Sequence, residues 1–131
     1  MQAYSVASFG IDNFSLTEYQ KPVPSANQVL IRVRAVSLNY RDLLVVKGSY
    51  NPKMKLPRIP FSDGTGEVVA VGDSVTRFRV GDRVASSFFQ NWIDGSPTAQ
   101  KIKGALGGDI DGMLAEFVAL DERGVPVARF L

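Results

Sequence analysis

The stretch FSDGTGEVVAVGDSVTRFRVGDRVA, from Phe61 to Ala85, decides the fold class of this chain. Its glycines and aspartates fit three structures: a phosphate-binding loop, an acidic metal site, or the turns of a barrel. A phosphate loop needs a strand, a G-x-G-x-x-G turn and then a helix. Here a strand-like segment follows Gly64-Thr65-Gly66, and Val69 occupies the third glycine position. The context favours β-turns and close backbone packing.

The aspartates of this stretch have an equally simple explanation. Asp63, Asp73 and Asp82 stand at spacings that match no calcium loop, and aspartate is common in turns because it bonds its own backbone. Asp109 and Asp111 flank Ile110 in another turn-like stretch. The chain has no cysteine and no histidine, which excludes disulfides, thiolate nucleophiles, Ser-His triads and zinc sites with nitrogen or sulfur ligands. Any metal would need oxygen ligands.

Length and composition predict one globular domain. The chain has 131 residues, 45% of them hydrophobic and 21% charged. The net charge is only +2 and the charged residues are scattered, so no basic face for nucleic acid is evident. No segment approaches the roughly 20 apolar residues of a membrane span, and the N-terminus lacks a basic and apolar leader pattern. We therefore expect a cytoplasmic protein with no nucleic-acid or membrane partner.

Alternation of apolar and polar residues predicts several short strands. It is clearest over residues 28–36, where Val29, Ile31, Val33 and Ala35 form one face and two arginines the other. Further strands are expected at residues 3–8, 14–19, 66–71, 81–87 and 113–120. The first two suggest a meander.

Two short helices are expected between these strands. The first spans residues 39–48, with Asn39 as N-cap, Asp42 in the first turn and Gly48 as its stop. The second begins at Ser96-Pro97 and runs to about Lys103. Many strands with two brief helices predict a mainly β, partly open barrel rather than a doubly wound sheet.

Several ordered motifs carry a resemblance to a known family. They are Asn39-Tyr-Arg-Asp42, Gly48-Ser-Tyr50, Leu56-Pro-Arg-Ile-Pro60, the Asp63–Gly72 and Val75–Val84 runs, and Gly112-Met-Leu-Ala-Glu-Phe117. Over residues 1–124 the chain resembles the N-terminal, GroES-like catalytic domain of the medium-chain dehydrogenase/reductase superfamily. The resemblance implies a GroES-like barrel without the Rossmann domain that follows it in the family. Residues 125–131 are expected to form a divergent or truncated tail, whether from natural truncation, a frameshift or a cut.

The resemblance also bears on metals and cofactors. Zinc-dependent members of the superfamily place Cys at the position of Asn39 and Gly-His-Glu at Phe61-Ser62-Asp63, so the ligands of catalytic zinc are absent here. A structural zinc lobe is absent too. The chain is therefore most similar to the zinc-independent, quinone-oxidoreductase-like branch. This implies reduction of a small quinone, enone or carbonyl with NAD(P)H, NADPH being favoured, and no cofactor bound by this chain alone.

Without zinc, hydrogen-bond donors must stabilise charge on a substrate oxygen. The expected catalytic residues are Asn39, Tyr50 and Ser62. The expected pocket residues are Tyr40, Arg41, Asp42, Asp63, Phe88, Phe89 and Trp92. Each has a structural alternative: a helix cap for Asn39, a wet barrel-edge tyrosine for Tyr50, a turn for Ser62 and Asp63, and core packing for the aromatic residues.

Two functions remain open at this level. The first is the substrate-binding half of a zinc-independent oxidoreductase, inactive without a cofactor domain. The second is a stand-alone barrel that binds a small ligand or a protein. A co-chaperonin role is more distant, because a shared fold does not carry function. In full-length relatives later segments complete this domain, so we expect exposed apolar surface, a free strand edge and self-association, as in a dimer.

Overall fold

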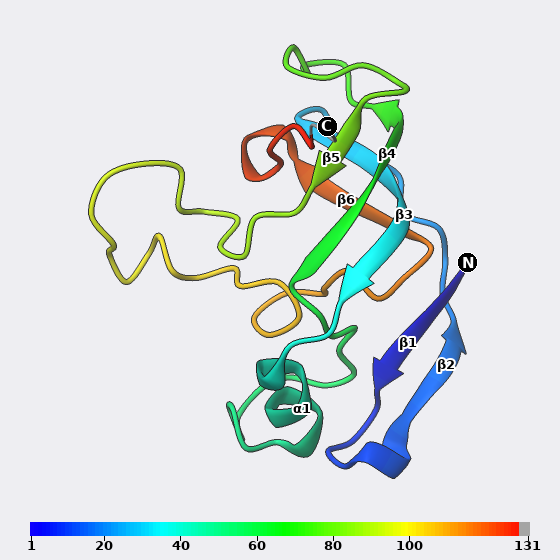
Figure 1. Cartoon of the computed structure of the whole chain (residues 1–131), viewed down its shortest axis with the longest axis vertical. Coiled ribbons are helices and arrows are strands. Elements are labelled where there is room, and N and C mark those ends of the chain that lie inside the picture. The colour runs from blue at the N-terminus through cyan, green and yellow to red at the C-terminus, as the bar shows by residue number, and fades with distance from the viewer. Residues whose placement is uncertain (129–131) are drawn as a thin grey trace.

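The computed structural model describes residues 1–128 and contains two antiparallel sheets (Figure 1). A hairpin of β1 (Gln2–Val6) and β2 (Phe14–Glu18) forms the smaller one. The larger sheet has the order β5-β4-β3-β6, with β3 (Gln28–Ser37), β4 (Asp63–Val71), β5 (Arg83–Ala85) and β6 (Phe117–Asp121). The two sheets do not join into a closed barrel. The predicted mainly β, partly open architecture is confirmed, and residues 1–128 contain no Rossmann unit.

Strand β3 is central to the larger sheet. It pairs with β4 along most of its length and with β6 along Gln28–Arg32. Two irregularities interrupt its register with β4, and the second lies between Val33 and Ala35. A bulge shifts the alternation of side chains by one residue. The expectation for Ala35 was therefore wrong, because Ala35 is exposed and Val36 packs against the core in its place.

The core lies against the inner face of the larger sheet. Its buried members are Val29, Ile31, Val68, Phe78, Val84, Leu106, Met113, Val118, Leu120 and Val125. Val125 belongs to the expected tail, yet it is 1% exposed, and Val127 forms a β-bridge with Val84. Residues 125–128 thus pack on the barrel. The boundary at residue 124 stays a prediction, and residues 129–131 lie outside the described part.

The first predicted helix is present as α1 (Tyr40–Lys47). Asn39 occupies the N-cap position, and its backbone N–H donates to Asp42 Oδ2 at 2.9 Å. At the other end, Gly48 has φ 80°, a left-handed conformation that suits glycine and ends the helix. Two short 3-10 helices, η1 (Ile11–Asn13) and η2 (Glu122–Gly124), lie at strand ends. Within residues 1–128, no helix is long and apolar enough to span a bilayer.

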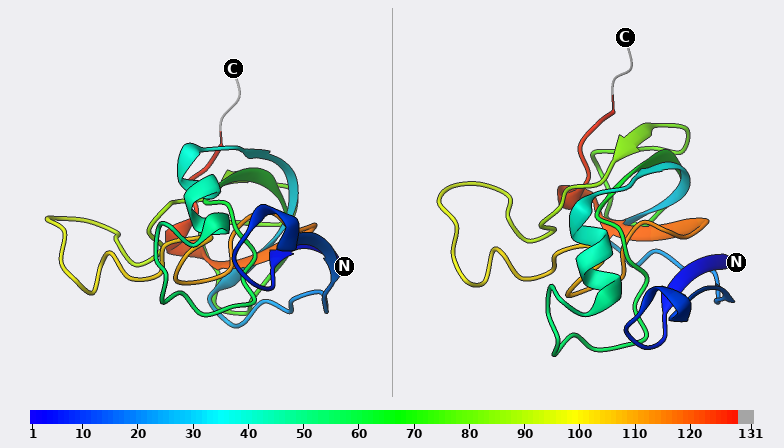
Figure 2. Two further views of the ribbon diagram at one scale, coloured as in Figure 1. Left: turned by 90° about the horizontal axis from the view of Figure 1, so that it is seen from below. Right: turned by 60° about the horizontal axis from the view of Figure 1, so that its bottom comes forward.

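The second predicted helix is wrong. Residues 99–102 form a turn instead, with a single helix-like hydrogen bond from Ile102 N to Thr98 O at 3.1 Å. The surrounding loop projects away from the barrel in Figure 2, and Ile102 is 44% exposed. A helix this short needs tertiary packing of an apolar face to be stable. The sequence signals for a cap and an N1 proline were present, but that packing is absent.

Candidate functional site

The pairing of β3 with β4 assembles the site. Ser37 at the end of β3 lies opposite Asp63 at the start of β4. Asn39 follows two residues later, and its Nδ2 donates to Asp63 Oδ2 at 2.8 Å. Ser62 Oγ donates to the other carboxylate oxygen, Asp63 Oδ1, at 3.0 Å. Three residues singled out in the sequence therefore form one hydrogen-bonded group, the Asn39–Ser62–Asp63 cluster.

The cluster leaves one donor free. A carboxylate only accepts, so the bond to Asp63 fixes which end of the Asn39 amide is nitrogen. That nitrogen carries two N–H groups, and within residues 1–128 the second makes no hydrogen bond. Ser62 is 2% exposed and its hydroxyl is committed to Asp63. Asn39 is therefore the member of the cluster that can donate to a ligand.

Hydrogen bonds between the Ser86 side chain and the backbone hold the Ser62 segment in place. Ser86 Oγ donates to Ser62 O at 2.7 Å and accepts from Gly64 N at 3.0 Å. Ser86 follows directly after β5, so the β4–β5 pairing fixes this bridge. Ser62 lies in a bend and Asp63 is already the first residue of β4, so the turn expected at these two residues is a bend that leads into a strand.

Arg41 occupies a different environment from Asn39. Its guanidinium carbon lies 4.7 Å from the centre of the Tyr50 ring and 4.5 Å from that of Phe88. Its Nη1 donates to Leu106 O at 3.1 Å. Arg41 therefore links α1, the loop after α1 and the segment that contains Phe88 and Leu106. Cation–π contacts of this kind favour a fixed arrangement of all three.

The predicted aromatic residues form a continuous row. Phe88 and Phe89 meet edge to face with ring centroids 4.6 Å apart, and Phe89 lies 6.0 Å from Trp92. None of the three is fully buried. The row connects to α1 through the contact of Arg41 with the Phe88 ring.

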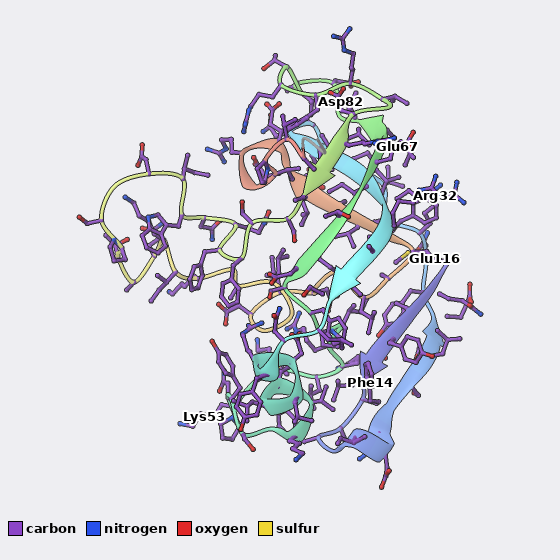
Figure 3. The ribbon with its side chains drawn as sticks, viewed as in Figure 1. Phe14, Arg32, Lys53, Glu67, Asp82 and Glu116 are labelled. Carbon is purple, nitrogen blue, oxygen red and sulfur yellow. The ribbon has the colours of Figure 1, made fainter. Side chains whose placement is uncertain are left out.

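An apolar cavity of about 370 Å³ lies beside Asn39, and we call it the α1 cavity. Its lining residues come from η1, the start of β2, the link between β3 and α1, α1 itself and the segment before β4. They are Ile11, Phe14, Leu38, Asn39, Tyr40, Asp42, Leu43, Val46 and Phe61. Figure 3 labels Phe14 at the start of β2. Of the predicted site residues, only Asn39, Tyr40 and Asp42 line this cavity.

A larger hollow, of about 600 Å³, lies elsewhere. It is bounded by the projecting loop and by the ends of β3 and β6, and none of the predicted site residues lines it. Gln90 and Lys101 contribute from the loop, and Asp121 and Arg123 from the barrel. Because it shares no lining residue with the Asn39–Ser62–Asp63 cluster, we place the candidate site at the α1 cavity.

Phe61 is the residue that sequence reasoning missed. It has φ 78°, and it is the one non-glycine residue with positive φ in the described part of the chain. Its side chain is 5% exposed and lines the α1 cavity. Strained backbone of this kind is concentrated at functional sites. Gly107 and Gly112 approach the Phe61 backbone closely in the structure, but they are far from Phe61 in sequence, so no local signal identified it.

Asp42 is the electrostatically unusual group of the site. Its side chain is 3% exposed, and its Oδ1 has no hydrogen-bond partner. Burial raises the pKa of its carboxyl, while the Asn39 backbone N–H and the Arg41 charge act in the lowering direction. The negative charge of Asp63 adds to the rise.

The residues present do not fit zinc or a dinucleotide. No group of three His, Cys, Asp or Glu side chains converges among residues 1–128, and Asp63 is already bonded to Asn39 and Ser62. Gly64 and Gly66 lie inside antiparallel strand β4, so they do not form a turn at a helix N-terminus. The glycine-rich stretch is therefore a strand with its turns.

Asp42 gives a testable dependence of stability on pH. Its folded-state pKa is raised above the ordinary value of about 3.9, so the folded protein binds this proton more tightly than the unfolded chain. The resulting stabilisation is complete below about pH 4 and is lost as the pH rises through the folded pKa. We expect the free energy of unfolding of wild type, relative to Asp42→Asn, to fall as the pH rises above about 4 in urea denaturation.

The control is Asp12→Asn, which removes an exposed carboxylate. The free energy of unfolding of wild type relative to Asp12→Asn should show no comparable dependence on pH. A wild-type advantage over Asp42→Asn that grows with rising pH would contradict this assignment.

Comparison with known proteins places these observations in a family. The family model of the alcohol dehydrogenase GroES-like domain matches residues 25–128. A zinc-type alcohol dehydrogenase-like protein of Schizosaccharomyces pombe is 41% identical over 112 residues, which are 85% of this chain and 32% of that protein. A quinone oxidoreductase of Pseudomonas aeruginosa is 48% identical over 68 residues, which are 52% of this chain and 21% of that protein.

The solved structures agree. A thermostable alcohol dehydrogenase from Pyrobaculum aerophilum superposes with a TM-score of 0.86 at 26% identity, over 99% of this chain and 41% of that one. The chain thus spans about a third of the length of the S. pombe relative. It belongs to the alcohol dehydrogenase GroES-like domain family, and its relatives are oxidoreductases of the medium-chain dehydrogenase/reductase superfamily.

Proposed function

We propose that this chain is the substrate-binding domain of a zinc-independent, NAD(P)H-dependent oxidoreductase that acts on a small quinone, enone or carbonyl compound. The observation that carries the proposal is the Asn39 amide. Asp63 holds it by one N–H, the other N–H makes no hydrogen bond within residues 1–128, and Asn39 is also one of the residues that line the apolar α1 cavity. A small apolar molecule with one acceptor oxygen matches this arrangement.

The chemistry of the cluster suits a reduction. An oxygen that gains negative charge as its substrate is reduced requires donors that are already in place. The free N–H of Asn39 supplies one, and the Asp63 carboxylate orients and polarises the same amide. Ser62 acts one step further out, because its hydroxyl donates to Asp63 rather than to the cavity. Tyr50, the other expected donor, is 48% exposed, stacks on Arg41 and does not line the α1 cavity.

Zinc independence rests on the side chains present. The S. pombe relative is named a zinc-type protein, but this chain has neither cysteine nor histidine. Asn39 and Ser62 are engaged in hydrogen bonds with Asp63 instead of facing a common centre. We further propose that a nicotinamide coenzyme, NADPH in preference to NADH, is bound by residues outside this chain, in keeping with the length of the relatives.

Removal of the Asn39 amide tests the proposed role directly. We expect p-benzoquinone to shift the Asn39 side-chain and Phe61 signals in a nitrogen-15 NMR titration. Asn39→Ala should weaken binding by about three- to tenfold, the value of one hydrogen bond. The absence of cysteine removes thiol adducts as a complication. The matched control is Asn51→Ala, an exposed asparagine whose side chain only accepts from Lys53 N. Equal affinity of the Asn39 variant and wild type would contradict the role.

The cofactor proposals have their own test. The isolated chain should be dialysed first against zinc and then against zinc-free buffer. It should then retain less than one zinc ion per molecule. It should also leave NADPH fluorescence unchanged, because residues 1–128 contain no phosphate-binding turn. Stoichiometric zinc would overturn zinc independence, and saturable NADPH binding would show an autonomous cofactor site.

The second candidate function is a self-associating binding module. Leu38 is 79% exposed and Tyr40 is 75% exposed, and both lie at the start of α1. Exposed apolar side chains in such a position favour contact with another surface. We propose that the chain associates with itself, and light scattering at tens of micromolar should give a mass above that of one chain. A strictly monomeric mass would count against this proposal while leaving the binding site intact.

A further inference from the structure

The backbone at Phe61 has an unfavourable conformation that must have a structural cause. Its φ of 78° lies in the left-handed region, where a bulky side chain is strained. Phe61 nevertheless holds its ring almost completely buried, at 5% exposure. A glycine would relieve the backbone at this point, so the ring is retained at a cost.

Neighbouring backbone holds Phe61 in this conformation. A Cβ on Gly112 would overlap Phe61 O, and one on Gly107 would lie 2.5 Å from Phe61 N. Met113 N donates to Phe61 O at 2.8 Å, and Gly112 N donates to Ile59 O at 2.7 Å. The two glycines and these two backbone hydrogen bonds thus enclose Phe61 from one side. Surroundings that over-determine a conformation are what allows such strain to persist.

The result is a rigidly placed ring at the candidate site. Phe61 immediately precedes Ser62, whose hydroxyl bonds Asp63, and its own side chain lines the α1 cavity together with Asn39. Ile11, Leu43 and Val46 line the same cavity. Its volume of about 370 Å³ is near the small end of ligand pockets, which span roughly 300–1,000 Å³.

We propose that Phe61 is a specificity-determining residue, whose ring makes the α1 cavity favour substrates with a single ring or a comparably small apolar body. This inference rests on the proposed function, because it concerns the cavity beside Asn39. The apolar body of the substrate packs against the Phe61 ring while its oxygen accepts from the Asn39 amide. Substrates with a second fused ring bind less tightly, because the Phe61 ring occupies part of the space that the second ring would use.

The test compares p-benzoquinone with 1,4-naphthoquinone, which adds one fused ring. Dissociation constants are measured by nitrogen-15 NMR for wild type and Phe61→Gly. Wild type should bind p-benzoquinone more tightly than 1,4-naphthoquinone. Phe61→Gly should increase the affinity for 1,4-naphthoquinone relative to p-benzoquinone by about tenfold, the scale of a small change in pocket fit. Phe61→Leu, which keeps an apolar side chain, should shift it in the same direction by less. Phe78→Ala removes a buried ring from the core, which does not line the cavity, and should leave the ratio unchanged.

The temperature of thermal unfolding tests the strain in the Phe61 backbone without any ligand. Phe61→Gly should unfold at a higher temperature than Phe61→Ala, whereas glycine is ordinarily the less stable of the two in a strand-like segment. The opposite order would overturn the claim of a strained backbone.

The possible results separate the inference from the function it rests on. If neither quinone binds wild type, the proposed function fails. If both bind but Phe61→Gly and Phe61→Leu leave their ratio unchanged, or if Phe78→Ala shifts it equally, the role of Phe61 in specificity is wrong.

Discussion

The antiparallel pairing of β3 with β4 is the constraint on which the site depends. The same pairing that buries Val29, Ile31 and Val68 sets Ser37 opposite Asp63. Asn39 and Asp63 are 24 positions apart in sequence, yet their side chains are joined at 2.8 Å because of that register. A slip of one residue would turn the carboxylate to the other face of the sheet. Core packing and site geometry are therefore fixed by one set of contacts.

Two further features hold this end of the barrel in place. Arg41 links α1 to the Tyr50 loop and to the aromatic row through its contacts with two rings and a carbonyl. Elsewhere, a backbone bond from Met113 holds the segment before Ser62. A site of donors functions only when its supporting residues are fixed. The Asn39 amide thus belongs to a pre-organised arrangement rather than to a mobile loop.

The features that the sequence predicts well are local ones. Asn39, Asp42 and Gly48 marked the limits of α1, because capping and left-handed termination depend on nearby residues. The alternation in β3 predicted its buried face up to the bulge before Ala35. The failed helix at residues 97–103 shows the limit of local signals, since a cap and a proline cannot supply a surface to pack against.

The site itself could be predicted only in part. Motifs identified Asn39, Ser62 and Asp63, but not that Ser62 would bond Asp63 and leave the free donor to Asn39. Arg41 was expected in the pocket, and its position between two rings depends on long-range contacts. The φ of Phe61 is set by glycines some 46 and 51 positions later in the chain, at 107 and 112. No local pattern contains that information.

The central claim is that Asp63 acts on a substrate through the Asn39 amide. A double-mutant cycle with Asn39→Ala, Asp63→Ala and the pair tests it most directly, with the dissociation constant of p-benzoquinone as the readout. Asp63→Ala should weaken binding in wild type and have little further effect once Asn39 is alanine. Independent, additive losses from the two substitutions would contradict it.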